Sequence, residues 1–133
     1  MKNLPLVFSA MIVGITLFQS ALVAPAINKL INVEDASVFL RYIWPKFFII
    51  IAIFSLASFI ILIINSNQNL FKYISFISFV LMLVCYLITP MINEAKDSLN
   101  DQLWTVLHLL TIILTFITLI INTLTIIYWK SSS

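Results

Sequence analysis

Four runs of apolar residues, each about 20 residues or longer, constrain the fold of this chain more than any other feature. A helix of this length crosses the hydrocarbon core of a bilayer, because all of its backbone polar groups are bonded within the segment. The composition agrees, since 62% of the 133 residues are hydrophobic and only 9% are charged. The sequence therefore predicts an all-α polytopic membrane protein, a four-transmembrane-helix bundle in a single domain over residues 1–133, with helices near 4–25, 40–64, 70–89 and 100–129.

Polar residues between the apolar runs indicate where the helices begin. Asp35 can cap a helix that starts at Ala36, because its carboxylate can accept a backbone N–H that has no helical partner. Ser98 and Asp101 have the spacing of a capping box, with Asp in place of the usual Glu or Gln. We therefore expect the last helix to begin near Leu99.

Prolines and aromatic residues indicate helix ends and the membrane surface. Pro90 is expected to follow the end of the third helix at Thr89, since proline cannot continue the backbone ladder. Pro45 lies inside the second helix and is expected to kink it near the membrane surface. Tyr42 and Trp44 lie where an interfacial belt of aromatic side chains is expected.

Polar side chains in the last apolar run recur at gaps of three and four residues, so they share one face of a helix. In hydrocarbon such a face packs against protein, whereas the Leu, Ile and Phe of the other faces can meet lipid. We expect burial of the polar positions and exposure to lipid or a partner of the apolar ones. The polar positions are Thr111, Thr115, Thr118 and Asn122, and the apolar ones are Ile112, Phe116 and Ile120.

The only histidine, His108, lies on this polar face near the expected membrane boundary. An unpaired imidazole close to hydrocarbon loses about 1–3 kcal/mol of hydration, so a polar partner is expected within hydrogen-bond or one-water reach. The partner must come from another part of the fold, on the outward side of the membrane. The candidates for this ligand or polar site are His108 itself, Asn93, Asn28, Glu94, Asp97 and Thr111.

A metal site is a second interpretation of the same region. Cys85, Met82 and His108 can lie at similar depth on facing helices, and soft sulfur with imidazole suits Cu(I). Met and Cys at helical spacing are also ordinary packing residues, and His108 can have a purely structural role. Copper is thus the one cofactor that the sequence suggests, and covalent haem is not expected because the Cys-x-x-Cys-His motif is absent.

Enzymatic activity is not expected from this sequence. Phosphate-binding loops and nicotinamide fingerprints need several glycines, and the chain has one. No Gly-x-Ser-x-Gly elbow precedes a serine. The net charge of +2 comes without a polybasic run, so nucleic acid is not an expected partner.

Residues 22–28 and 87–93 resemble each other, since both contain Leu, Pro, Ile and Asn at matching positions. Two membrane helices separate the segments, which places both on the same side of the bilayer. The sequence is therefore compatible with two pseudo-repeated helical hairpins related by an axis along the membrane normal. The alternative stays open that Pro and Asn simply recur where apolar helices end.

Short motifs along the chain also carry a family resemblance. They are Gly14, Phe18 and Val23-Ala24-Pro25, then Trp44-Pro45-Lys46-Phe47-Phe48, Pro90 with Asn93, and residues 104–111. They resemble a family of small four-helix membrane proteins of unknown function, distantly similar to the copper-resistance D membrane domain and to a vertebrate membrane protein associated with cisplatin resistance. In the last motif Trp104, Leu107-His108 and Thr111 match the family pattern, whereas Thr115 stands where it has Asn. The resemblance implies the fold and the membrane location.

Two functions from different classes are compatible with these observations. One is a small integral membrane protein with a ligand, ion or metal site near the outward ends of the helices at 4–25, 70–89 and 100–129. The alternative is a structural accessory subunit of a larger membrane complex, whose partners are the lipid bilayer and other membrane subunits or further copies of the chain. Lys2, ahead of the first apolar run, favours cytoplasmic termini in the inner (plasma) membrane of a bacterium.

Overall fold

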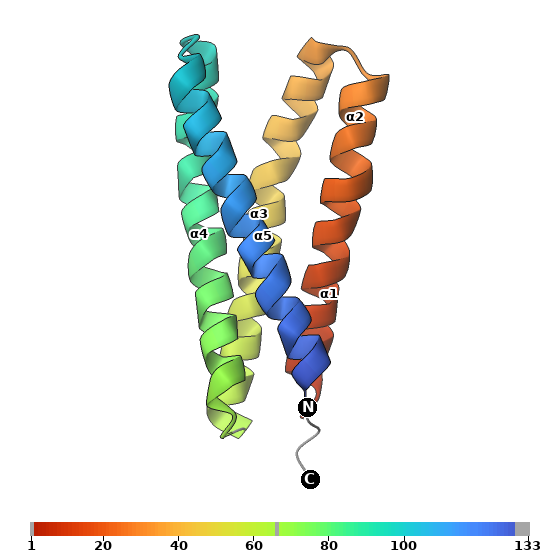
Figure 1. The fold of residues 1–133 in the computed structure, drawn as a ribbon, viewed down its shortest axis with the longest axis vertical. Helices are drawn as coiled ribbons and strands as arrows, with labels where there is room; N and C mark the ends of the chain where they lie inside the picture. Colours follow the sequence, from red (N-terminus) through yellow and green to blue (C-terminus); the bar gives the residue numbers. More distant parts are fainter. Residues whose placement is uncertain (1, 66, 130–133) are drawn as a thin grey trace.

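The computed structural model describes residues 2–65 and 67–129 and is helical throughout that part of the chain, apart from short connections (Figure 1). Four of its helices are long and apolar enough to cross a membrane, which confirms the predicted all-α membrane architecture. The first of them consists of three consecutive elements, α1, η1 and α2. The elements are α1 (Leu4–Phe18), η1 (Gln19–Val23), α2 (Ala24–Leu30), α3 (Val33–Asn65), α4 (Asn69–Asp97) and α5 (Asp101–Tyr128).

The helices neighbour one another in the cyclic order α1, α3, α4, α5. Figure 1 shows α5 crossing the molecule obliquely, beside α4 at one end and beside α1 at the other. Within the described residues α5 contacts α1 but neither η1 nor α2. We call the end with Asn3, Trp129 and the α3–α4 connection the closed end, and the end with the α2–α3 and α4–α5 connections the open end.

A polar network joins three helices in the closed half. Asn122 of α5 accepts a hydrogen bond from the Ser9 hydroxyl of α1 (3.0 Å) and donates one to the Ser78 Oγ of α4 (2.9 Å). Its second amide N–H donates to the carbonyl of Thr118 (2.8 Å). Asn122 is 2% exposed, so the network lies in the protein interior. At the closed end itself, the Trp129 indole donates a hydrogen bond to the Asn3 side chain (3.1 Å) and links the two described ends of the chain.

The polar face of α5 is buried largely as predicted. Thr111, Thr118 and Asn122 are buried, and Thr115 is half-buried. On the opposite faces the apolar side chains are exposed, as expected for contact with lipid. They are Ile112, Phe116 and Ile120.

Two helices continue through prolines that were predicted to lie at their ends. The first helix runs past Pro25 to Leu30, because Pro25 lies in the first turn of α2, directly after the π-helical η1. The α-helical hydrogen-bond ladder is already shifted by the π turn directly before Pro25, so the missing proline N–H interrupts the helix where its register changes. Helix α4 contains Pro90 and ends at Asp97, not at Thr89. One lost backbone bond does not end a helix whose apolar faces pack on both sides of it.

Both predicted caps were wrong, one by three residues and the other by two. Helix α3 begins at Val33, and the cap is Asn32, whose Oδ1 accepts the backbone N–H of Asp35 (2.8 Å). The Asn32 amide in turn donates to the Asp35 carboxylate (2.9 Å), so Asp35 completes a reciprocal cap from the first turn. Helix α5 begins at Asp101, with Asn100 as its cap.

Ser98 belongs to the preceding helix and not to a capping box at the start of α5. Its hydroxyl donates to the carbonyl of Glu94 (2.9 Å), while Leu99 adopts a left-handed conformation with φ 59°. The backbone N–H groups of Leu99 and Asn100 donate to the carbonyls of Lys96 and Ala95, respectively. This pairing is a Schellman motif, and it ends α4 in a sharp turn.

Candidate functional site

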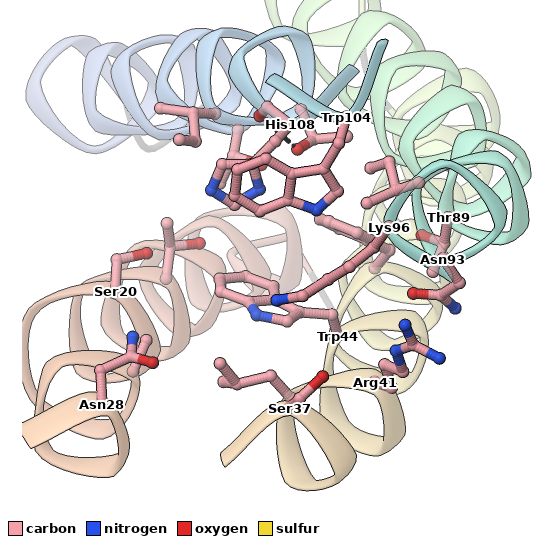
Figure 2. A pocket seen from close by; sticks show the side chains of 18 of the residues that line it. Ser20, Asn28, Ser37, Arg41, Trp44, Thr89, Asn93, Lys96, Trp104 and His108 are labelled. Atoms are coloured by element: carbon pink, nitrogen blue, oxygen red, sulfur yellow. Dashed lines mark hydrogen bonds between the residues drawn. The ribbon is translucent and has the colours of Figure 1, made fainter. Parts of the chain in front are cut away.

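A cavity of about 480 Å³ lies between the four membrane helices in the open half of the molecule (Figure 2). Its volume falls within the range of about 300–1,000 Å³ that is typical of small-molecule sites. Every long helix contributes to its wall. The lining residues named below are Thr16, Ser20, Ala24 and Asn28 of the first helix, Ser37, Arg41, Trp44 and Phe48 of α3, Thr89, Asn93 and Lys96 of α4, and Trp104, His108, Thr111, Ile112, Thr115, Phe116 and Leu119 of α5.

The π-helical turn keeps one face of the first helix on the cavity. The lining residues Thr16, Ser20, Ala24 and Asn28 are each four positions apart. In a pure α-helix, with 3.6 residues per turn, such a series rotates by about 40° at every step. The wider turn of η1 offsets part of this rotation, because its bonds join residues five apart. Asn28 therefore lines the same cavity as Thr16, whose buried hydroxyl has no hydrogen-bond partner among the described residues.

Continuation of α4 through Pro90 completes a second wall. The buried positions Met82 and Cys85 are followed on the same helix face by Thr89, Asn93 and Lys96, at successive gaps of four, four and three residues. The first two pack in the core, and the last three line the cavity. A helix that ended at Thr89 would leave Asn93 and Lys96 in a loop. The site therefore depends on the continuation of α4 beyond Pro90.

Aromatic rings and a cation gather at the open end of the cavity. The His108 ring stacks on the Trp104 indole, with ring centroids 4.8 Å apart and planes 9° from parallel. The Lys96 ammonium lies 5.4 Å from the centroid of the Trp104 ring. Figure 2 shows the Lys96 side chain extending between the indoles of Trp44 and Trp104. Trp44 is half-buried, stacks on Phe48 and lines the site, and its place in an interfacial belt stays a prediction.

Positive charge exceeds negative charge at the open end of the cavity. Arg41 forms a two-point ion pair with Asp97, with N–O distances of 3.2 and 2.5 Å. Lys96 has no ion pair or hydrogen bond among the described residues, and no acidic residue of that part of the chain lines the cavity. The cavity therefore carries a positive charge that the described protein does not neutralise.

Four of the six predicted site residues line the cavity. His108, Asn93, Asn28 and Thr111 come together there from three helices. Glu94 and Asp97 do not: Glu94 is exposed, and Asp97 is bound to Arg41.

The hydrogen-bond partner that was predicted for the His108 ring is not found among the described side chains. Among residues 2–65 and 67–129 no side chain makes a hydrogen bond to the His108 ring, which instead stacks on Trp104. Asp97, one of the expected partners, is bound to Arg41. A contact through one water to Asn93 or Asn28 stays a prediction.

The predicted metal ligands do not share one cavity. Cys85 and Met82 are fully buried in the core with Ile12 and Phe47, and neither lines the space that His108 faces. The described part of the chain contains no group of three His, Cys, Asp or Glu residues placed to hold a metal ion. The residues present do not fit a copper site of Cys85, Met82 and His108.

Sequence analysis missed several lining residues, and for Lys96 and Trp44 a usable signal existed. Lys96 continues the three-four periodicity of α4, but Pro90 had been taken as its end. Trp44 lies between Arg41 and Phe48 at gaps of three and four, which is the same core-facing pattern. Ser20 was also missed, because its place on the cavity depends on the π turn, for which the sequence offers no comparable signal.

The two similar segments, 22–28 and 87–93, occupy comparable places in the fold. Each surrounds a proline inside a long helix of the open half, and Asn28 and Asn93 both line the cavity. The helices that carry them are diagonal in the bundle, as an axis along the membrane normal requires.

Comparison with known proteins identifies the family. Residues 7–101 match the family described as a domain of unknown function, DUF4149. No curated protein and no solved structure matches the chain. The more distant similarity to the copper-resistance D membrane domain stays an expectation from the sequence. The match covers more than half of the residues and includes three of the four long helices almost completely. The chain, with its four membrane-compatible helices, therefore belongs to the DUF4149 family.

Proposed function

We propose that this protein binds a small ligand within the membrane, in the cavity of its open half. The observation that carries the proposal is the cavity itself, about 480 Å³ lined by side chains from all four long helices. A bundle whose only role was to be packed would be expected to fill such a space, since protein interiors leave few voids larger than a water molecule. The proposed role is binding, not catalysis.

Polar groups without protein partners support this proposal. The Thr16 hydroxyl is buried and has no hydrogen-bond partner in the described chain. The His108 ring also lacks one, although it is half-buried. Leaving such groups unpaired costs about 1–3 kcal/mol each, and a bound ligand or ordered water can supply the missing partner.

The proposed location follows the sequence argument. The described ends of the chain meet at the closed end, where Trp129 bonds Asn3, so both lie on one side of a membrane. We place that side in the cytoplasm of a bacterium and the open end with its cavity outward, on the strength of Lys2. The alternative role, a structural accessory subunit of a larger complex or oligomer, leaves the cavity without a ligand.

A cavity-filling substitution tests the proposal. Ala24 is half-buried and lines the cavity, whereas Ala26 on the same helix is exposed and does not. We expect small molecules extracted from the protein purified in mild detergent to include a species that Ala24→Phe lacks and that Ala26→Phe retains. If the extracts of both variants and of the wild type are identical, the structural role is left as the better account.

A further inference from the structure

Polarity changes along the length of the cavity. On α5 the lining extends from Trp104 to Leu119, about 22 Å of helix. Near the open end the wall is polar and aromatic, with Lys96, Asn93 and His108. Deeper it becomes mainly apolar, with Phe48, Phe116 and Leu119, and the Thr16 hydroxyl is a polar exception there. A ligand that matches this wall has a polar head and an apolar body.

The charge at the polar end selects the kind of head group. Lys96 offers an ammonium with no described ion pair, and Asn28 and Asn93 offer amide N–H donors. No described acidic side chain lines the cavity to receive a cationic head group. Arg41, which also lines the cavity, forms an ion pair with Asp97 and thereby neutralises that carboxylate. These donors suit an anion such as a phosphate ester.

The cavity has an opening toward lipid. Because the backbones of η1 and α2 do not come close to that of α5 in the described structure, a gap separates the first helix from α5 along the cavity. Ile112 and Phe116 lie at this gap: both line the cavity, yet they are 51% and 59% exposed. A molecule within the bilayer can reach the cavity through this gap without crossing water.

From these observations we infer that the cavity holds an acidic phospholipid of the surrounding leaflet, with its phosphate at Lys96 and one acyl chain along Phe48, Phe116 and Leu119. This inference rests on the proposed ligand-binding function and adds the class of ligand. The indoles of Trp44 and Trp104 flank the Lys96 chain and hold the ammonium at the mouth, where a phosphate would lie. His108 can donate to the same head group from its place on Trp104.

Native mass spectrometry of the full chain in a neutral detergent tests the inference. The probes are phosphatidylglycerol and phosphatidylcholine with identical acyl chains, each titrated against wild type, Lys96→Gln, Lys96→Arg and Lys29→Gln. Lys29 is a matched control, because it lies next to Asn28 at the same end but does not line the cavity. Inorganic phosphate is added as a competitor in a separate arm.

We expect wild type to bind phosphatidylglycerol more tightly than phosphatidylcholine. Lys96→Gln should weaken phosphatidylglycerol binding about tenfold, the loss of one charge-assisted contact, while Lys96→Arg and Lys29→Gln stay close to wild type. Equal affinity for the two lipids, or an equal loss in Lys96→Gln and Lys29→Gln, would overturn the assignment. Displacement of the lipid by inorganic phosphate alone would also overturn it, since the site would then recognise a free anion.

Failure of this inference is distinguishable from failure of the proposed function. If Ala24→Phe abolishes binding of both lipids while Lys96→Gln changes neither, the cavity binds a ligand but not through its charge. If Ala24→Phe and Ala26→Phe bind both lipids as wild type does, the cavity is not the binding site and both proposals fall.

Discussion

Asn122 and Thr16 are both buried polar residues in membrane helices, and they differ in what surrounds them. Asn122 has hydrogen bonds to Ser9, Ser78 and the Thr118 carbonyl. The Thr16 hydroxyl lines the cavity and has no hydrogen-bond partner in the part of the chain that the structure describes. In the low dielectric of this interior a satisfied amide joins helices, whereas an unsatisfied hydroxyl favours binding of water or a ligand. The same polar chemistry thus stabilises the closed half and supports binding in the open half.

Replacement of Asn122 by Ala should destabilise the bundle by about 1–3 kcal/mol, because it removes bonds to two other helices and leaves two buried serines unpaired. Thr123→Ala is the control, since Thr123 bonds only the Leu119 carbonyl of its own helix and should change stability by less than about 0.5 kcal/mol. Unfolding in SDS titrations measures both. A double-mutant cycle with Ser78→Ala should show coupling, and additive effects would argue against the network.

Single residues also show what sequence reasoning could predict. Burial of Thr118 and Asn122 follows from periodicity alone, because a polar side chain in an apolar helix must face protein. The pairing of Arg41 with Asp97 could not be predicted, since it joins residues far apart in the chain whose depth depends on helix ends. His108 lines the cavity beside other polar residues, and its ring stacks on Trp104, a contact that the sequence did not predict.

At the scale of helices, prolines were poor predictors of where the helices end, whereas apolar runs predicted the number of helices correctly. Pro25 and Pro90 both lie inside continuous helices, and the continuation of each helix carries a lining residue, Asn28 or Asn93. Tertiary packing compensates for one missing N–H, and a π turn precedes Pro25. Apolar length therefore predicts the number of helices well, whereas local stop signals predict their ends poorly.

The cap of α3 gives a test at this scale. Asn32→Ala removes the acceptor of the Asp35 backbone N–H and should cost about 0.5–2 kcal/mol. Asn32→Ser keeps an oxygen at the cap and should recover most of the stability. Thermal unfolding in detergent, followed by circular dichroism, compares the two. Equal stability of Ala and Ser variants would show that Asn32 does not cap the helix.

The turn that ends α4 gives a second test. Leu99 has φ 59°, a conformation that costs about 1–2 kcal/mol for a residue with a side chain, and it is 84% exposed. Leu99→Gly should therefore raise the free energy of unfolding by about 0.5–1 kcal/mol, after the greater flexibility of glycine in the unfolded chain is deducted. Leu109→Gly, at an exposed position within α5, should lower it by about 1 kcal/mol. A loss of stability in Leu99→Gly would show that the exposed leucine makes a contact of its own.

At the scale of the whole molecule, the closed and open halves follow from where α5 lies. It contacts α4 in both halves, at Ser78 and at Lys96, but it packs against the first helix only along α1, so the first helix separates from it in the open half (Figure 1). Sequence periodicity predicts which face of a helix is buried, but not how far two helices remain in contact. The cavity depends on that crossing, and therefore it could not be predicted from the apolar runs alone.

The arrangement of connections makes a prediction about sidedness. The α3–α4 connection lies at the closed end and the α4–α5 connection at the open end, so Asn67 and Leu99 should be on opposite sides of the membrane. Both are exposed, and the only native thiol, Cys85, is 0% exposed. A membrane-impermeant maleimide should thus label Asn67→Cys and Leu99→Cys from different sides, with little labelling of the parent protein. With the proposed orientation Leu99→Cys reacts in intact cells, and Asn67→Cys reacts only after permeabilisation. The reverse order would overturn the orientation alone, whereas labelling of both positions from one side would contradict the four-helix crossing itself.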